Sequence, residues 1–539
     1  MKTLNWKIPI SILIISFAYL WNIGTPVMWG DEAGTAIFAR NVIKTGVPVG
    51  FDGRNLAVFG NCASVSTSLL SKKIPWAQYY IGSISIMFFG ETTVGVRFLF
   101  VLIGMCAFFP LYSILKKQSH HAALITTLVL ISPQIVFFQR NARYFPILIF
   151  LFCFLLWTYS YEFRSQKVRF ALVCICSLLF FHTHQLAAFC SMISVLIFCL
   201  LRDKKGIKIY LPTFLLGFAS WLIFYLYLKS VPGSNYEMVR LLFEHTSRWV
   251  TVFFSGIKAG MLDLDFVNAL PIMAWAIIFI LALSRKNKGN IFSVLGAPIS
   301  LLILINIGVQ IIVTSALIGF ETRNQYSVLR FMPHLITTAI IPLLLVIETL
   351  LSKALGNRAA KRWLIPAAFI LITISNVFSF SYWFSPLPGR THRVSWWTPV
   401  YSEIIKREPD SIKMVIDTIS QENISNDSTI VVWPSYLNEV FSFYVGHRNL
   451  ILPSVLRNSE CEKYVIREIG VSAYNRFYKN PKWYIIFRDS PGKTPPGYEL
   501  IKIPFYRHSP DATRPELTRH GFIENSNRQI RYINIYRKL

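Results

Sequence analysis

The feature that most restricts this chain is a series of apolar stretches, each close to the length needed to cross a lipid bilayer. A spanning helix needs about 20 residues, and only helices and closed barrels satisfy their backbone groups in lipid. Hydrophobic residues make up 53% of the chain and charged residues only 15%, as in membrane proteins. We therefore expect a polytopic α-helical membrane protein with about eleven transmembrane helices. The stretches are 8–23, 94–115, 122–139, 145–161, 168–182, 186–201, 208–229, 266–283, 291–318, 331–351 and 363–384.

Lysine and arginine gather in the short loops between these stretches, and they predict the orientation. The first stretch lacks a small-x-small cleavage site, so we expect it to be kept as a helix with a cytoplasmic N-terminus. The alternation holds only if the short apolar segment 76–90 lies in the outer interface without crossing. The long loops 24–93 and 230–265 then face outside a bacterial inner membrane. The basic cytoplasmic loops are 116–117, 164–169, 202–208, 285–288 and 353–362.

The formal net charge of +27 has to be explained, because in a soluble protein it would suggest nucleic-acid binding. Here the basic residues cluster beside apolar stretches, which the rule of positively charged inner loops explains. The sequence has no zinc-finger or basic-arm pattern. We expect membrane lipids as partners and no nucleic acid.

The composition changes near residue 390 and predicts two parts. Residues 1–390 form the transmembrane module, and residues 391–539 form a soluble periplasmic α/β domain. In the second part, strand-length apolar runs alternate with helix-like stretches, and a β-hairpin is expected within 521–537. Neither a phosphate loop nor G-x-G-x-x-G is present, so docking or acceptor binding is the default role. The expected strands are 428–434, 449–453 and 482–488.

Two adjacent carboxylates, Asp31 and Glu32, follow the first apolar stretch and precede a helix-like segment. One interpretation is structural, because acidic residues stabilise the first turn of a helix. The other is a catalytic carboxylate at the membrane interface. Spacing alone favours the structural interpretation.

Cationic and polar side chains lie in the same outer loops and could hold an anion. Lysine beside a membrane can keep its ammonium at the headgroups or clamp a lipid phosphate. Arginine on an outer turn runs against the usual charge bias and is often functional, although it can also reach the interface. The candidates for holding an anion are Lys72, Lys73, Arg143 and Arg330, and the candidates for other contacts with a substrate are Arg140, Tyr144, His184 and Glu321.

The evidence for a metal site is weak. His182 and His184 form H-x-H, for which a hydrogen-bonding role is favoured, and Asp263 and Asp265 form a short D-x-D. We expect no cofactor, and we expect transfer chemistry to proceed without a divalent metal. Cys62 and Cys461 lie outside the apolar stretches and could pair in an oxidising compartment.

Taken together, these motifs resemble the GT-C glycosyltransferases, and in particular the group of protein O-mannosyltransferases and lipid A aminoarabinose transferases. The resemblance covers roughly residues 8–385. It rests on the acidic pair after the first stretch, Lys-Ile-Pro before the interfacial segment, Ala-Arg-Tyr at 142–144, Thr-His at 183–184, and Arg-x-x-Pro at 330–333. The family's usual His-Pro-Pro is replaced by Lys-Ile-Pro, which leaves the acceptor open.

The resemblance implies an inverting transfer of a sugar from a polyprenyl-phosphate donor to an envelope lipid, glycan or protein. Asp31 matches the catalytic acidic residue, with Glu32 beside it. Lys73 matches the donor-phosphate lysine, with Lys72 as its neighbour, and Arg143, Tyr144, His184 and Arg330 match the remaining positions. A transporter or flippase, and a ligase of lipid-linked glycans, remain as alternatives.

Overall fold

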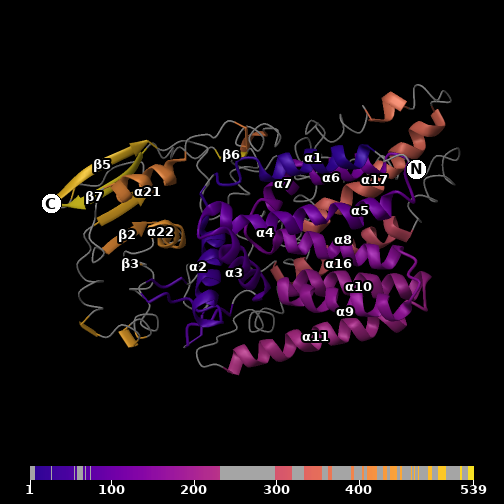
Figure 1. The fold of residues 1–539 in the computed structure, drawn as a ribbon, viewed down its shortest axis with the longest axis horizontal. Helices are drawn as coiled ribbons and strands as arrows, with labels where there is room; N and C mark the ends of the chain where they lie inside the picture. Colours follow the sequence, from indigo (N-terminus) through magenta and orange to yellow (C-terminus); the bar gives the residue numbers. More distant parts are fainter. Residues whose placement is uncertain are drawn as a thin grey trace.

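The structure is a computed structural model. It describes residues 6–230, except 26, 54, 58–64, 67, 73 and 74, and beyond them 298–318, 333–354, 362–366 and the shorter pieces between 390 and 539 that carry the strands. The helical part lies at one end of the molecule and a β-sheet lies at the other (Figure 1). Expected stretches at 266–283 and most of 363–384 lie outside the described residues.

The helical part is built largely from the expected apolar stretches. Among the residues that the structure describes, four helices are long and apolar enough to cross a membrane: Thr93–Leu115, Gln166–Thr183, Gln185–Arg202 and Ile207–Leu228. Three shorter apolar helices accompany them, at Lys7–Leu20, Tyr144–Ser160 and Pro298–Gln310. The elements are α1 (Lys7–Leu20), α4 (Thr93–Cys106), α5 (Phe108–Leu115), α6 (Ala122–Leu130), α7 (Pro133–Gln139), α8 (Tyr144–Ser160), α9 (Gln166–Thr183), α10 (Gln185–Arg202), α11 (Ile207–Ser230), α16 (Pro298–Ile318) and α17 (Pro333–Ala354).

The helix expected at 122–139 is divided in two by a proline. The stretch 122–139 forms α6 and α7, with a break at Ile131 and Ser132. Pro133 is the cause, because proline lacks an N–H and disfavours a helical residue before it, yet it fits the first position of a new helix.

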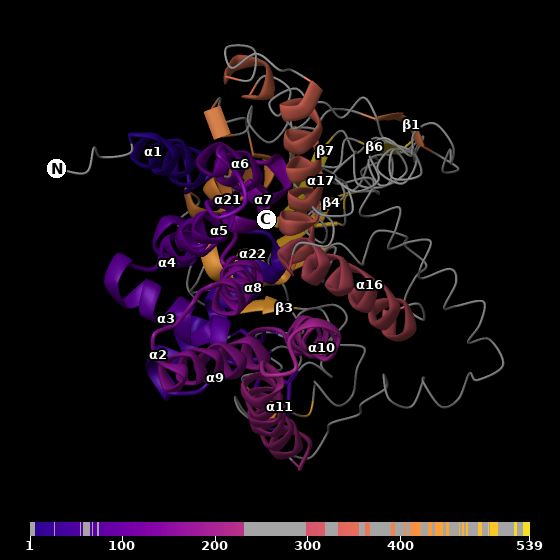
Figure 2. The same ribbon diagram turned by 90° about the vertical axis from the view of Figure 1, so that its right-hand side faces the viewer.

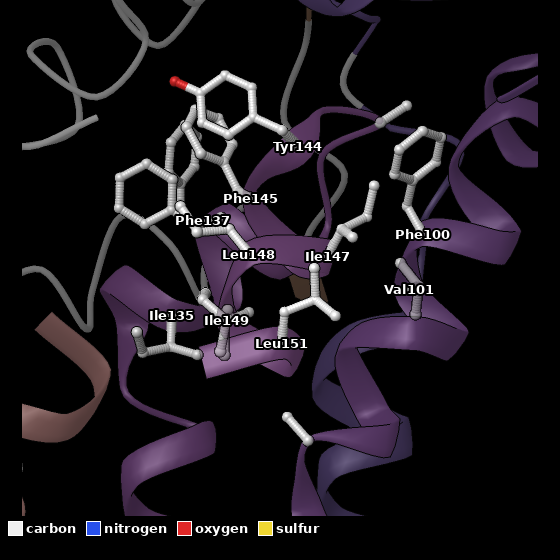
Figure 3. Packing of buried hydrophobic residues seen from close by; sticks show 14 of the residues in the cluster. Phe100, Val101, Ile135, Phe137, Tyr144, Phe145, Ile147, Leu148, Ile149 and Leu151 are labelled. Carbon is white, nitrogen blue, oxygen red and sulfur yellow. The ribbon is translucent and has the colours of Figure 1, made fainter. Parts of the chain in front are cut away.

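Helix α8 forms the centre of the helical part. It packs against α4, α5, α9 and α17, and the view along the bundle shows it surrounded by other helices (Figure 2). Most of its side chains are buried. Figure 3 shows the aliphatic residues of α8 packed with Phe100 and Val101 of α4. This packing fixes the start of α8, where Tyr144 lies.

Two helices of the first loop lie across the end of the bundle. Helix α2 (Gly30–Thr45) runs across the other helices, between them and the sheet (Figure 1). Helix α3 (Ala77–Phe89) matches the segment expected to form an interfacial helix, and it packs along α2. A Cβ atom on Gly82 would lie 2.9 Å from the Cβ of Ala39, so glycine permits this close packing. The other face of α3 exposes Met87 and Phe88.

The C-terminal part contains a five-stranded sheet in the order β3-β2-β4-β7-β5. Strand β2 pairs in parallel with β3 and β4, and β7 pairs antiparallel with β4 and β5. Helix α21 packs on β5, and α22 packs on β3 and on α2. The elements are β1 (Arg390–Arg393), α21 (Ser411–Gln421), β2 (Thr429–Trp433), α22 (Asn438–Tyr444), β3 (Asn449–Ile451), β4 (Trp483–Phe487), β5 (Tyr498–Pro504), β6 (Phe522–Glu524) and β7 (Tyr532–Lys538).

The strands expected at 428–434, 449–453 and 482–488 are confirmed as β2, β3 and β4. The hairpin expected within 521–537 is wrong. Strand β6 pairs with β1, while β7 lies between β4 and β5. Ile533 and Ile535 of β7 are fully buried, and a buried strand needs partners on both edges to satisfy its backbone groups. A turn motif in the sequence cannot show which strands those partners are.

Candidate active site

The candidate site lies at the start of α2. The N-cap residue of this helix is Trp29, in an extended conformation, and Asp31 and Glu32 occupy the first turn. Successive residues of a helix point about 100° apart, so the two carboxylates face different surroundings. The Glu32 side chain is completely buried, whereas 28% of the Asp31 side chain is exposed.

Glu32 is held in a closed network. Arg97 of α4 donates from Nε to Oε1 and from Nη2 to Oε2, each at 2.7 Å. The backbone N–H of Ala142 donates to Oε1 at 2.7 Å, and Arg97 Nη1 donates to the carbonyl of Ile23 at 2.9 Å. A buried carboxylate is tolerated when a cation and further donors surround it. Glu32 therefore joins α2, α4 and the turn before α8.

Asp31 has a more open environment, and its cationic partner among the described residues is Arg143. Arg143 Nη2 donates to Asp31 Oδ2 at 3.0 Å, and Arg143 Nη1 donates to the backbone carbonyl of Asp31 at 3.2 Å. The guanidinium carbon also lies 5.8 Å from the ring centre of Trp29 and 5.2 Å from that of Tyr144. A partly exposed carboxylate can exchange a proton with a bound molecule, and the adjacent guanidinium can attract an anion.

The turn from Gln139 to Tyr144 holds these groups together. Asn141 Oδ1 accepts a hydrogen bond from the Trp29 indole at 3.1 Å. Arg143, which the sequence singles out because arginine is unusual on a turn expected to face outside, points at Asp31. Tyr144 lies at the border of the buried cluster, and its hydroxyl points away from Leu148 and Leu151 (Figure 3).

Arg140 lies away from Asp31 and contacts the end of α1. Its Nη1 donates to the carbonyls of Ala18, Tyr19 and Trp21, and its Nη2 donates to that of Asn22, at 2.7 to 3.2 Å. The last carbonyls of a helix have no partner within the helix, and a cation there stabilises them. These contacts give Arg140 a role in capping α1.

His184 contributes from the junction of α9 and α10. Its ring centre lies 4.7 Å from that of Tyr144, and its Nδ1 accepts from the N–H of Ala187 at 3.2 Å, which caps α10. Burial, with a smaller contribution from the charge of Arg143, lowers the pKa of His184 to about 4. His182 instead contacts Ser220 of α11. In the part of the chain that the structure describes, no group of three or more metal-binding side chains is found.

Sequence reasoning missed two residues of α3 that face the site. Gln78 is fully buried, and its Oε1 accepts from the N–H of Tyr144 at 3.1 Å. Its Nε2 has no hydrogen-bond partner among the described residues. Tyr79 contacts Ser71 at 3.0 Å, and burial raises its pKa to about 12, with Arg143 and Asp31 close enough to affect it. The sequence does contain a signal for them, because Gln78 and Tyr79 are polar residues within the otherwise apolar segment 76–90.

Of the other candidates, the structure describes only Lys72. Lys72 is half-buried in the loop before α3. The remaining candidates lie outside the described residues, as do both cysteines considered for pairing; they are Lys73, Asp263, Asp265, Glu321, Arg330, Cys62 and Cys461.

Comparison with known proteins gives a fold-level match over nearly the whole chain. No protein-family model and no curated protein matches the sequence. Two crystal structures of ArnT from Cupriavidus metallidurans are similar, each with a TM-score of 0.52 and covering 98% of this chain and 97% of ArnT. The chain has the ArnT fold. ArnT is a lipid A aminoarabinose transferase of the GT-C fold, so the expected fold type is confirmed. The sequence identity is 14% to the apo structure and 13% to the structure bound to undecaprenyl phosphate.

Proposed function

We propose that this protein is an inverting glycosyltransferase that moves a sugar from a polyprenyl-phosphate donor to an envelope lipid, glycan or protein. The observation that carries the proposal is the partly exposed Asp31 carboxylate beside Arg143, at the start of a helix lying across the end of an apolar bundle. The ArnT fold supports it, and one ArnT structure contains undecaprenyl phosphate.

In the proposed reaction, Asp31 accepts the proton of the acceptor hydroxyl while that oxygen attacks the anomeric carbon of the sugar. A new carbon–oxygen bond forms on one face as the bond to the lipid phosphate breaks on the other. The bonding electrons leave with the phosphate, and the anomeric configuration inverts.

The departing phosphate needs positive charge and hydrogen-bond donors beside it. Arg143 is already directed at the site by Asp31, and its guanidinium supplies the positive charge and the N–H geometry that suit a phosphate. The Nε2 amide of Gln78 is a second donor close to the start of α8. We assign Lys72, Lys73 and Arg330 to the same phosphate as part of the proposal, and we assign Tyr144 and His184 to contacts with the rest of the substrate.

We assign the two carboxylates different roles. Glu32 is surrounded by Arg97 and the Ala142 N–H, so taking up a proton there would break a buried ion pair. Asp31 is the group that solvent can reach. Glu32 then supports the site by holding α2 against α4, and Asp31 acts as the base.

We also propose that the site faces the outside of a bacterial inner membrane and that the N-terminus is cytoplasmic. The basic loops 116–117, 164–169 and 202–208 support this orientation, since such loops are kept inside. Cysteine labelling in intact cells tests it. If an impermeant reagent labelled residues near Lys204 in intact cells, that loop would lie outside and the proposed orientation would be wrong.

We propose that the transfer needs no divalent metal, because inversion at carbon with a phosphate leaving group can rest on side-chain cations alone. Activity should survive EDTA. Complete loss in EDTA, restored by manganese or magnesium, would instead bring Asp263 and Asp265 into the mechanism.

Mass spectrometry of envelope lipids and glycans tests the function directly. Cells with the wild-type protein should carry a single-sugar modification that is missing without the protein and in the Asp31→Asn variant. Accumulation of a complete lipid-linked glycan on the inner leaflet would favour the flippase alternative. If cells without the protein failed to transfer long glycans to their acceptor, the ligase alternative would be favoured.

A further inference from the structure

The C-terminal domain contacts the short segment that leads into α2. The N–H of Val27 donates to Asp410 Oδ2 at 3.0 Å, and the N–H of Met28 donates to the hydroxyl of Tyr444 at 2.8 Å. That hydroxyl also lies 2.7 Å from Thr93 Oγ1, at the start of α4. Two successive backbone donors before Asp31 therefore depend on side chains more than 380 residues later in the chain.

These contacts matter because the segment has no regular structure of its own. Val27, Met28 and Trp29 are all buried, so water does not replace a lost partner for their N–H groups. A buried N–H without an acceptor is costly, and most are paired in folded proteins. Asp410 and Tyr444 supply the acceptors here.

Both acceptors are themselves fixed in the domain. Asp410 Oδ1 accepts from the N–H groups of Ile412 and Lys413, at 2.9 and 3.2 Å, which caps α21. Tyr444 ends α22, the helix that packs on α2. Burial raises the pKa of Tyr444 to about 12, so its hydroxyl keeps its proton and can donate to Thr93 while accepting from Met28.

The opposite side of the same segment is held by the helical part. The Trp29 indole donates to Asn141, and Arg143 grips the backbone carbonyl and the carboxylate of Asp31. The start of α2 is thus clamped between the turn before α8 and the C-terminal domain. A shift of this segment would move Asp31 relative to Arg143, and small displacements of catalytic groups reduce rates strongly.

We propose that Tyr444 and Asp410 are positioning residues that hold Asp31 in place, so that the C-terminal domain is a structural part of the active site. The proposal rests on the function proposed above. It differs from a docking or acceptor-binding role, because neither side chain needs to touch a substrate.

Hydrogen exchange tests the clamp without any activity assay. The Tyr444→Phe variant keeps the ring and removes the acceptor for the Met28 N–H. We expect the amide of Met28 to exchange about tenfold faster, a change equivalent to one modest hydrogen bond. Tyr536→Phe, which makes the same change at a buried tyrosine of β7, should leave that amide unchanged. Unchanged exchange at Met28 in Tyr444→Phe would overturn the clamp.

A second variant guards against a general loss of folding. In Asp410→Asn, the remaining amide oxygen can still cap α21, while the new NH₂ group cannot accept from Val27. We expect faster exchange at Val27 with only a small fall in melting temperature. If exchange became faster throughout the C-terminal domain, Asp410 would stabilise that domain as a whole, and its role in positioning Asp31 would be wrong.

Turnover and ligand binding then separate positioning from binding. In cells, the initial rate of envelope modification should fall about tenfold for Tyr444→Phe and stay unchanged for Tyr536→Phe. The Kd of purified Tyr444→Phe for undecaprenyl phosphate should stay within about twofold of wild type. If Tyr444→Phe had the wild-type rate while Asp31→Asn was inactive, the positioning role of Tyr444 would be wrong and the proposed function would stand. If wild-type protein modifies no envelope component, the proposed function fails, and the exchange result still decides whether the clamp exists.

Discussion

At the start of α2, two arginine–carboxylate pairs lie next to each other and differ in their access to solvent. The closed pair, Glu32 with Arg97, is completed by a backbone N–H and has almost no exposed surface. The open pair, Asp31 with Arg143, leaves 28% of the carboxylate side chain exposed and borders Trp29 and Tyr144. Similar residue pairs thus serve different purposes, because burial decides whether a carboxylate can exchange protons.

The largest expected effect comes from removing the charge of the open pair. Asp31→Asn keeps the shape of the side chain and should lower the transfer rate by about 10² to 10⁴-fold, because the base is lost. The melting temperature in detergent should change little, since a partly exposed ion pair contributes about 1 kcal/mol or less. A folded Asp31→Asn protein with the wild-type rate would leave Asp31 as a structural residue.

The closed pair should respond in the opposite way. Glu32→Gln leaves Arg97 buried without a counter-charge, which should cost about 3–5 kcal/mol of folding free energy. Thermal unfolding in detergent measures this. Glu32→Gln with Arg97→Met should recover part of the stability, because the second change removes the buried charge that the first leaves without a partner. A stable Glu32→Gln protein that is inactive would transfer the catalytic role to Glu32.

Replacing Arg140 tests whether this arginine, three residues before Arg143, binds substrate or stabilises the end of α1. Arg140→Ala removes the donors to the last carbonyls of α1 and should destabilise the protein by about 1–2 kcal/mol. The Kd for undecaprenyl phosphate should not change. If Arg140→Ala raised the Kd and left the stability unchanged, Arg140 would be a substrate-binding residue. Arg143→Ala should raise the Kd, because Arg143 lies beside Asp31.

The smallest expected effect concerns pH. Burial lowers the pKa of His184 to about 4, so between that value and about 6.5 the unfolded chain binds a proton that the folded protein does not. Stability should therefore fall as the pH falls through this window, by about 1 kcal/mol between pH 7 and pH 5.5. Melting curves should show the same slope in wild type and in His120→Asn, an exposed histidine, and a slope smaller by that amount in His184→Asn.

The apolar stretches and the loop chemistry determined much of the helical part. Length and hydropathy are local properties, so the helices at 93–115, 166–183, 185–202 and 207–228 follow from the sequence. Arg143 can also be singled out from the sequence, because an arginine is unusual on a turn that is expected to face outside. The split at Pro133 follows from the chemistry of one residue, although the pattern of hydropathy concealed it.

Only the tertiary structure decided what these groups touch. Asp31 and Glu32 are adjacent and chemically alike, and their difference arises from Arg97 and Ala142, which lie far away in the sequence. Arg140 and Arg143 lie three residues apart and point to different partners. Strand β7 lies beside β5 and β4, and Tyr444 reaches Met28, through contacts that no local pattern encodes. Hydropathy along a chain records where each residue prefers to be, whereas burial and hydrogen bonding depend on which distant segments meet.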